Sequence, residues 1–261
     1  MGYPTNTSNF LAIAEVRFQG IAQLSNYISA VQQAFSQVAY SQASVLKNQG
    51  MQVEQFGAQQ MLLPAVHNNY AFANREHTRQ FILNEQCLVF KVTDFQDFES
   101  FTALFQEGVY IVNKLINIVT SQRMGLRLFK RIVPRSRLSM QDYLQPNEAK
   151  LLDRFGGVTG YSHTELAHEF NDIHLLHRVK CCPYSGLELP KDVHANDMAF
   201  KSEVLNYQGP SIFLDSDGFV QQNQDLSLPT VKDNLKKIHA ILGLAFQSSV
   251  SDLALSEIGF R

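Results

Sequence analysis

The hydrophobic residues of this chain recur with two different periods, and the order in which those periods alternate restricts the fold. Residues 13–19 alternate, with Ala14, Val16 and Phe18 on one side of the segment, as a half-buried strand requires. Apolar residues within 24–38 then recur every three or four positions, which predicts an amphipathic helix. The period changes again later in the chain, so both strands and helices contribute to the core.

Several more segments of the first half are typical of strands. Residues 47–59 are rich in glutamine and punctuated by glycine, which favours a loop. Beyond this loop, apolar and β-branched residues predict extended segments at residues 60–66, 70–74, 79–83, 87–93 and 124–133. A turn at residues 84–86 would join two of them in a hairpin, and Pro134 would end the last.

A long helix is predicted before the last of these strands. Its apolar stripe runs with helical spacing from Phe98 to Val119, and Asp94 or Asp97 is suited to cap its first turn. The first half therefore reads strand, helix, several strands, helix, strand. Helices on one face of a mostly antiparallel sheet fit that order, so we predict an α+β fold.

The second half contains a similar mixture of elements. We expect a short helix at residues 148–155, an irregular stretch at 182–197 and a turn at 215–218. Ser227, with a proline two positions later, begins a long C-terminal helix, and Ser251 caps a short final one. Strands are predicted at residues 158–165, 173–181, 198–207 and 211–214.

The chain is thus divided into an N-terminal α+β half, residues 1–135, and a C-terminal α+β half, residues 146–261. Residues 135–146 follow Pro134, end at Pro146 and resemble a linker. One continuous domain with a shared sheet is the alternative.

The composition excludes several broad classes of protein. Charged residues make up only 18% of the 261 residues and the net charge is −2, so no overall field attracts nucleic acid or an anionic membrane. No apolar stretch is long enough to span a membrane, and the N-terminus lacks a signal-peptide pattern. The three cysteines include the adjacent pair Cys181 and Cys182, which is unsuited to a disulfide. We therefore expect a cytoplasmic protein without a membrane partner.

Four segments together resemble a sporadically distributed, uncharacterised family of bacterial proteins of about this length. They are the EVRF strand at residues 15–18, the block at residues 72–101, the RMGLRLFKRI strand at residues 123–132, and the C-terminal segments IFLDSDGF and LKKIHAILGLAFQSSVSD. The resemblance spans nearly the whole chain, although the loop at residues 181–197 has no counterpart. It implies a cytoplasmic bacterial protein of the kind found among defence-linked or mobile genes. It supplies no catalytic residues.

The segment from residue 123 to residue 137 carries six positive charges and no acid. The charges are Arg123, Arg127, Lys130, Arg131, Arg135 and Arg137, and the first five are our candidate partner- or anion-binding residues. On a strand, the first, second and fourth of them share one face, and the intervening apolar residues face the core. Such a row of guanidinium groups suits successive phosphates or the acidic surface of a protein. The alternative is a solvated sheet face balanced by carboxylates of neighbouring strands, such as Glu15 or Glu85.

Histidines and cysteines are concentrated between residues 163 and 194. A zinc site needs four convergent ligands, usually with tight paired spacing. On the predicted strand, His177 and Cys181 lie on one face while His174 and Cys182 lie on the other, so these four candidate ligands do not converge. We predict no metal and no cofactor.

Other motifs have ordinary structural explanations. The sequence at residues 215–218 resembles the start of a calcium loop, but Leu226 stands where the loop requires a bidentate glutamate. The glycines at residues 156–160 lack the lysine of a phosphate-binding loop. Cys87 lies in an apolar strand, and Cys181 belongs to no known nucleophile signature, so we predict no catalytic residue.

These patterns favour a non-catalytic binding or regulatory protein that acts through a protein partner, with residues 123–137 as the contact surface. The resemblance adds a link to defence or mobile elements. The rival is an RNA- or nucleotide-binding protein that uses the arginine-lined face, with His77 or His163 as a general base if it processes RNA. A third reading is a metal-dependent hydrolase built on residues 163–194.

Overall fold

The structure is a computed structural model that describes residues 9–56, 59–135, 138–146, 161–183, 186–187, 189–190, 192–193 and 198–258 and, outside residues 48–67, their side chains. Its centre is one large sheet whose described pairings are all antiparallel. The strands follow the order β2-β3-β4-β5-β1-β6-β9-β8-β7, and β10 pairs with β6. The fold is therefore α+β, as the alternating periods predict.

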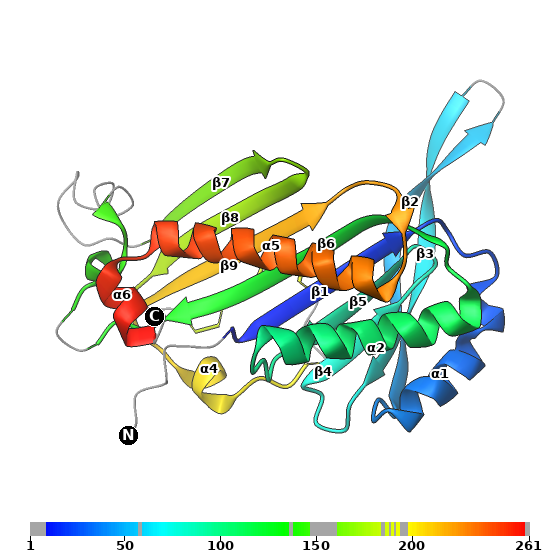
Figure 1. Cartoon of the computed structure of the whole chain (residues 1–261), viewed down its shortest axis with the longest axis horizontal. Helices are drawn as coiled ribbons and strands as arrows, with labels where there is room; N and C mark the ends of the chain where they lie inside the picture. Colours follow the sequence, from blue (N-terminus) through cyan, green and yellow to red (C-terminus); the bar gives the residue numbers. More distant parts are fainter. Residues whose placement is uncertain are drawn as a thin grey trace.

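The strands vary widely in length. Their bounds are β1 (Leu11–Phe18), β2 (Gln42–Phe56), β3 (Gln59–Ala73), β4 (Arg79–Leu83), β5 (Cys87–Val92), β6 (Thr120–Ile132), β7 (Ser162–Phe170), β8 (Ile173–Cys182), β9 (Ser211–Val220) and β10 (Gln224–Asp225). The hairpin of β2 and β3 extends beyond the body of the sheet (Figure 1).

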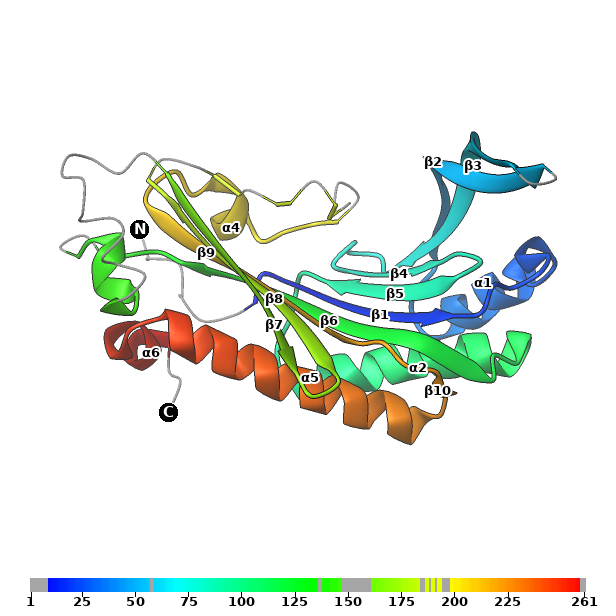
Figure 2. The same ribbon diagram turned by 90° about the horizontal axis from the view of Figure 1, so that it is seen from above.

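Three helices cover one face of the sheet. They are α1 (Ile28–Gln37), α2 (Phe98–Ile116) and the C-terminal α5 (Leu228–Ser249), and a short helix α6 (Asp252–Ile258) follows α5. On the other side lie the β2–β3 hairpin and the segment that carries α4 (Ser202–Asn206), at opposite ends of the sheet (Figure 2). We call the side without α1, α2 and α5 the open face.

Local signals explain where the two long helices begin. The Asp97 carboxylate accepts a hydrogen bond from the backbone N–H of Ser100 at 2.8 Å, which caps α2. The Ser227 hydroxyl accepts from the N–H of Thr230 at 3.2 Å and caps α5 in the same way. At the other end of α2, Asn117 adopts φ 59, a left-handed conformation that ends a helix.

The main core lies between the sheet and the helices, and phenylalanine fills much of it. Phe81 stacks on Phe90 with ring centroids 4.3 Å apart, and Phe35 of α1 stacks on Phe72 at 4.9 Å. All four rings are at most 1% exposed. Stacked rings bury large apolar areas in preferred geometries, so these contacts fasten α1 to the sheet.

Both halves of the chain contribute to the same sheet. β1 and β6 pair at its centre, with β5, β4 and β3 beyond β1 and with β9, β8 and β7 beyond β6. α2 follows β5 in the chain just as α5 follows β9 and β10, so the two halves have a similar order about the central pair. The sheet thus continues across the division placed at residues 135–146.

Three predictions of local structure are wrong. Residues 47–56 belong to β2, because a ladder with β3 from Gln42↔Ala73 to Phe56↔Gln59 overrides their loop-like composition. Residues 198–207 contain α4 in place of a strand. Residues 215–218 are the middle of β9, not a turn. The predicted helix at residues 148–155 lies outside the described residues.

Gly218 explains the last of these differences. It faces α5, and a Cβ at this position would lie 2.6 Å from Cγ2 of Ile238 and 3.0 Å from Cδ2 of Leu242. The glycine therefore permits a close approach between strand and helix. Among the described residues, none of the helices combines the length and the apolar character needed to cross a membrane.

Candidate binding site on the open sheet face

The arginines of β6 lie on the open face, as their spacing predicts. Met124, Leu126 and Leu128 alternate with them and are at most 5% exposed within the main core. The arginine side chains are themselves largely enclosed, because Arg127 and Arg131 are each only 9% exposed. Their contacts therefore decide what this face can do.

Arg127 belongs to a buried ion-pair network. Its Nε and Nη2 donate to the two carboxylate oxygens of Asp215 on β9, each at 2.7 Å, and its Nη1 donates to Asp192. Arg178 of β8 donates to the same Asp215 carboxylate at 3.0 Å and to Glu165 of β7 at 2.6 Å. Burial disfavours the charged form of Arg127, but Asp215 outweighs that effect and raises the Arg127 pKa.

Arg123 is balanced by an acid of the neighbouring strand. It donates to Glu15 of β1, which also accepts from Nε of Arg17 at 2.8 Å. The guanidinium of Arg123 lies over the Phe219 ring, 4.1 Å from its centroid. Glu15 thus balances the charge of Arg123, as the alternative drawn from the sequence proposed. Glu85 forms no ion pair with these arginines in the part of the chain described.

The other members of the basic segment contact different parts of the chain. Arg131 donates to the Ser211 hydroxyl at 3.0 Å and to the carbonyl of Val204 at 2.8 Å, so it fastens the α4 segment to the sheet. Lys130 lies on the helix-covered side, 4.0 Å from the centroid of the Phe246 ring, and burial lowers its pKa to about 8. Arg135 pairs with Glu257 at 3.2 Å. Arg137 lies outside the described residues.

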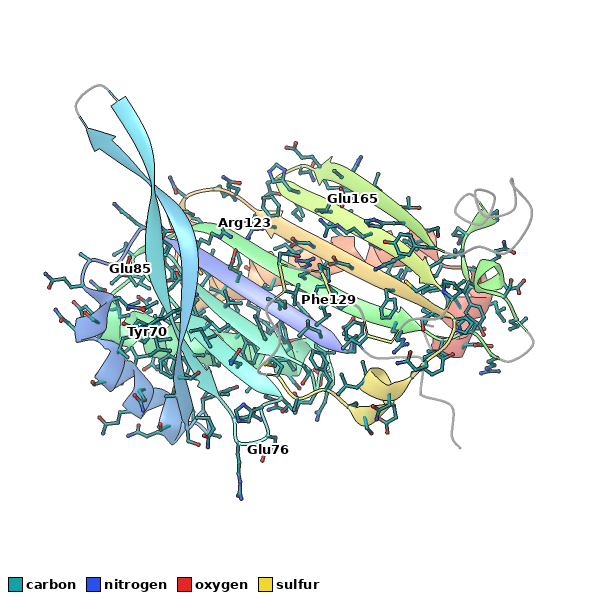
Figure 3. The ribbon with its side chains drawn as sticks, turned by 180° about the vertical axis from the view of Figure 1, so that it is seen from behind. Tyr70, Glu76, Glu85, Arg123, Phe129 and Glu165 are labelled. Atoms are coloured by element: carbon teal, nitrogen blue, oxygen red, sulfur yellow. The ribbon has the colours of Figure 1, made fainter. Side chains whose placement is uncertain are left out.

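A cavity of about 390 Å³ opens beside Arg123 and Arg127. We call it the central cavity. Its floor comes from the open faces of β1, β4, β5, β6 and β9, and its walls come from the base of the β2–β3 hairpin and from the segment at residues 192–193. Its charged residues are Glu15, Arg17, Lys91, Arg123, Arg127, Asp192 and Asp217. Figure 3 looks onto this face, with Arg123 labelled.

Asp217 differs from the other acids of the central cavity. Among the described residues it has no hydrogen bond or ion pair, although it projects from the same face of β9 as Asp215. Burial raises its pKa, and the positive charges of Arg127 and Arg123 only partly oppose that effect. A carboxyl group with a raised pKa that lines a cavity and lacks a partner is typical of a functional site.

A second cavity of about 270 Å³ adjoins the central cavity at Asp192, which lines both. We call it the lateral cavity. Its walls are largely aromatic and apolar, with cationic groups at the rim: Phe10, Phe129, Tyr161, His163, Arg178, Lys180, Leu189, Pro190, Asp192, Phe213, Leu214 and Asp215. Nζ of Lys180 lies 5.0 Å from the centroid of the Tyr161 ring, and Tyr161 is 55% exposed. An apolar or aromatic group would fit between these rings.

The histidines and cysteines of β8 lie on two faces. His177 is 4% exposed beneath α5, where Nδ1 and Nε2 lie 2.8 Å from the hydroxyls of Ser216 and Ser249. Cys181 is buried on the same face, whereas His174 stacks on Phe219 of the open face. Cys182 is also buried, in another apolar cluster. Within the described ranges, no group of three or more His, Cys, Asp or Glu side chains could hold a metal ion.

Glu15 is the one acid of this site that the sequence relates to the arginines. The sequence patterns place Asp215 and Asp217 in a turn and Glu165 among the histidines and cysteines of residues 163–194, and they give Arg178 and Asp192 no role. A usable signal existed: apolar residues follow at 219 and 220 and could continue the strand predicted at residues 211–214, and both aspartates have the parity of one strand face. The aspartate–glycine sequence, which usually marks turns, concealed that pattern.

No model of a known protein family matches this chain, and no curated protein matches it. The resemblance described from the sequence therefore remains a prediction, and the geometry of the open face carries the functional argument.

Proposed function

We propose that this chain is a binding protein that holds a segment of a partner protein in its central and lateral cavities. The central cavity carries the proposal, because it is concave, draws on both halves of the chain and contains the carboxyl group of Asp217, which has no partner among the described residues. The family resemblance is compatible with a bacterial regulatory protein linked to defence, and that role is part of the proposal.

The charges of the cavity indicate the chemistry of the segment. Arg123 and Arg127 already donate to Glu15, Asp192 and Asp215. A purely anionic ligand would have to displace those carboxylates, which costs several kcal/mol for the buried Arg127–Asp215 pair, about 3–5 when one partner is lost. The carboxyl group of Asp217 is instead free to accept hydrogen bonds from a ligand as far as the described residues go, so the segment supplies a donor such as a lysine, arginine or amide group there. An adjacent apolar or aromatic side chain occupies the lateral cavity.

Filling the central cavity tests this proposal. Gly125 lines it, and a Cβ at this position would meet no atom closer than 3.5 Å, so the β-carbon of Gly125→Val fits and its two methyl groups fill part of the cavity. Gly20→Val is the matched control, because a Cβ there has no neighbour within 4 Å and Gly20 lies outside the cavity. We expect Gly125→Val to fold normally and to lose its partner, and Gly20→Val to keep it.

A photo-crosslinking amino acid identifies the partner. Placed at Leu46, it faces the central cavity; placed at Tyr110 of α2, which is 52% exposed, it samples the helix-covered side as a control. We expect one protein to be captured from host cells at Leu46 and not at Tyr110, and the capture to disappear with Gly125→Val. Equal capture at both positions, or capture that survives Gly125→Val, contradicts the proposal.

The lateral cavity favours a second candidate, a nucleotide-binding protein. Bases stack on aromatic rings, and the Tyr161–Lys180 pair resembles the platforms that bind single-stranded nucleic acid. Thermal shift assays with ATP, GTP and a short oligouridylate test it at low and high salt. Stabilisation that falls with salt and is lost in Tyr161→Ala and Lys180→Ala would favour nucleotides over a protein segment.

A further inference from the structure

The strand β7 forms one border of the sheet and leaves an edge exposed. It pairs with β8 on one side, and no described strand pairs with it on the other. Residues 165–170 are exposed to solvent, and two of them are large apolar residues, Leu166 at 52% and Phe170 at 42%. An exposed edge strand with apolar side chains is a template for pairing with another strand.

The hairpin geometry shows which backbone groups point outward. A two-residue loop joins β7 to β8, and its first residue, Asn171, adopts φ 53, as such tight turns require. The flanking pair Phe170↔Ile173 is then a hydrogen-bonded pair, and the pattern alternates along the strand. Even-numbered residues of β7 therefore direct their backbone groups toward β8. The odd-numbered residues direct theirs to the open edge: His163, Glu165, Ala167 and Glu169.

The charges of these outward residues select one register for a second copy of β7. In an antiparallel pairing centred on Leu166, His163 of each copy faces Glu169 of the other, and Glu165 faces Ala167. A shift of the centre to residue 165 places Glu165 opposite itself. A shift to residue 167 places Glu165 opposite Glu169. Like charges directly opposite are destabilising, so of these three registers only the one about Leu166 is complementary.

The same register also pairs the apolar side chains of the strand. Leu166 lies opposite Leu166 of the second copy, and Phe170 lies over Ser162 at each end. Both exposed apolar residues of β7 would lose contact with water. A twofold interface requires every contact to be reciprocal, and one strand that is complementary to itself meets that requirement.

We propose that the protein forms a symmetric dimer in which two β7 strands pair antiparallel about Leu166 and join the two sheets into one. The occupant of the edge is a second copy of this chain, because the alternation of His163, Glu165 and Glu169 is complementary to its own reverse.

Backbone and charge variants test the dimer separately. Ala167→Pro removes an N–H that points to the open edge and leaves the ladder with β8 intact, and Ala167→Ser is its control. Glu169→Lys places a cation opposite His163 at two symmetry-related positions. The double variant His163→Glu with Glu169→Lys places a glutamate opposite a lysine at both positions and restores complementarity.

Sedimentation equilibrium over a wide concentration range gives the dimer dissociation constant. We expect a dimer for the wild-type chain and for Ala167→Ser, a monomer for Ala167→Pro, a dissociation constant about tenfold higher for Glu169→Lys, and recovery in the double variant. Circular dichroism confirms that each variant is folded; if Ala167→Pro is not, the two charge variants decide.

A wild-type chain that stays monomeric at every concentration overturns the proposal. So does a dimer that survives folded Ala167→Pro, since pairing must then use another surface such as the β2 edge. If Glu169→Lys weakens association and the double variant does not recover it, the register about Leu166 is excluded.

Discussion

Asp215 and Asp217 lie two residues apart on the same face of β9, yet within the described part of the chain only Asp215 is paired. Asp215 accepts two hydrogen bonds from Arg127 and one from Arg178, whereas Asp217 faces the central cavity with no partner among the described residues. The register of β6 against β9 explains the difference in part. Arg127 is the pairing partner of Asp217 across the two strands, but its guanidinium group donates to Asp215. One aspartate stabilises the sheet and the other remains available to a ligand.

Removing the Asp215 carboxylate should destabilise the protein strongly. Asp215→Asn leaves the buried guanidinium of Arg127 with only the exposed Asp192, and we expect a loss of about 3–5 kcal/mol in the free energy of unfolding. Urea denaturation measures it, with Asp225→Asn on β10 as the control for a carboxylate outside the network. The free energy of unfolding should fall less in the double variant Arg127→Met with Asp215→Leu than in Asp215→Asn. An equal or larger loss would contradict this account of the pair.

Removing the Asp217 carboxylate should have the opposite effect. Burial in the folded state raises the Asp217 pKa above the ordinary value of an aspartate, so ionisation costs folding free energy as the pH rises through the folded pKa. Asp217→Asn does not ionise, so we expect a higher melting temperature than wild type at neutral pH and a smaller difference at pH values below about 4. A lower melting temperature at neutral pH would mean that the carboxylate is stabilised by a contact in the fold.

His177 should make the protein sensitive to mild acid. Burial lowers its pKa to about 4, below the value near 6.5 in the unfolded chain. The neutral ring is therefore favoured by folding, and its contribution is complete above pH 6.5 and is lost as the pH falls toward 4. The total is on the order of 3 kcal/mol.

Urea midpoints between pH 7 and pH 5 measure this dependence. We expect the urea midpoint of His177→Gln to depend less steeply on pH than that of the wild type. His168→Gln, at an exposed position of β7, should keep the wild-type dependence. Unchanged slopes in both variants would assign the acid sensitivity to other groups.

Gly218 and Gly243 should respond oppositely to alanine. Gly218→Ala places a Cβ 2.6 Å from Ile238, so we expect a loss of about 1–3 kcal/mol from overpacking between β9 and α5. Gly243→Ala, within α5, has no neighbour within 4 Å and should gain up to about 1 kcal/mol from helix propensity. Thermal unfolding of both variants tests the pair. A neutral Gly218→Ala would show that α5 can move away from the sheet.

Local sequence signals were sufficient where neighbouring residues decide the structure. The apolar stripe from Phe98 and the cap at Asp97 predict α2, and the alternation of β6 predicts which residues face the core. These signals failed where hydrogen bonding to strands distant in the sequence decided the local structure. Residues 47–56 form a strand because β3 supplies a continuous ladder, and residues 215–218 stay extended because β6 and β8 pair with both edges of β9.

The sequence by itself determined the α+β class, the long helices and the shared face of the β6 arginines, because each depends on the period of nearby side chains. The tertiary structure alone decided which carboxylate meets which arginine. Arg127 and Asp215 are 88 positions apart, and no local period relates them. Their meeting depends on the register of β6 against β9, two strands that both pack beneath α5. In the same register, Asp217 faces the central cavity without a partner among the described residues.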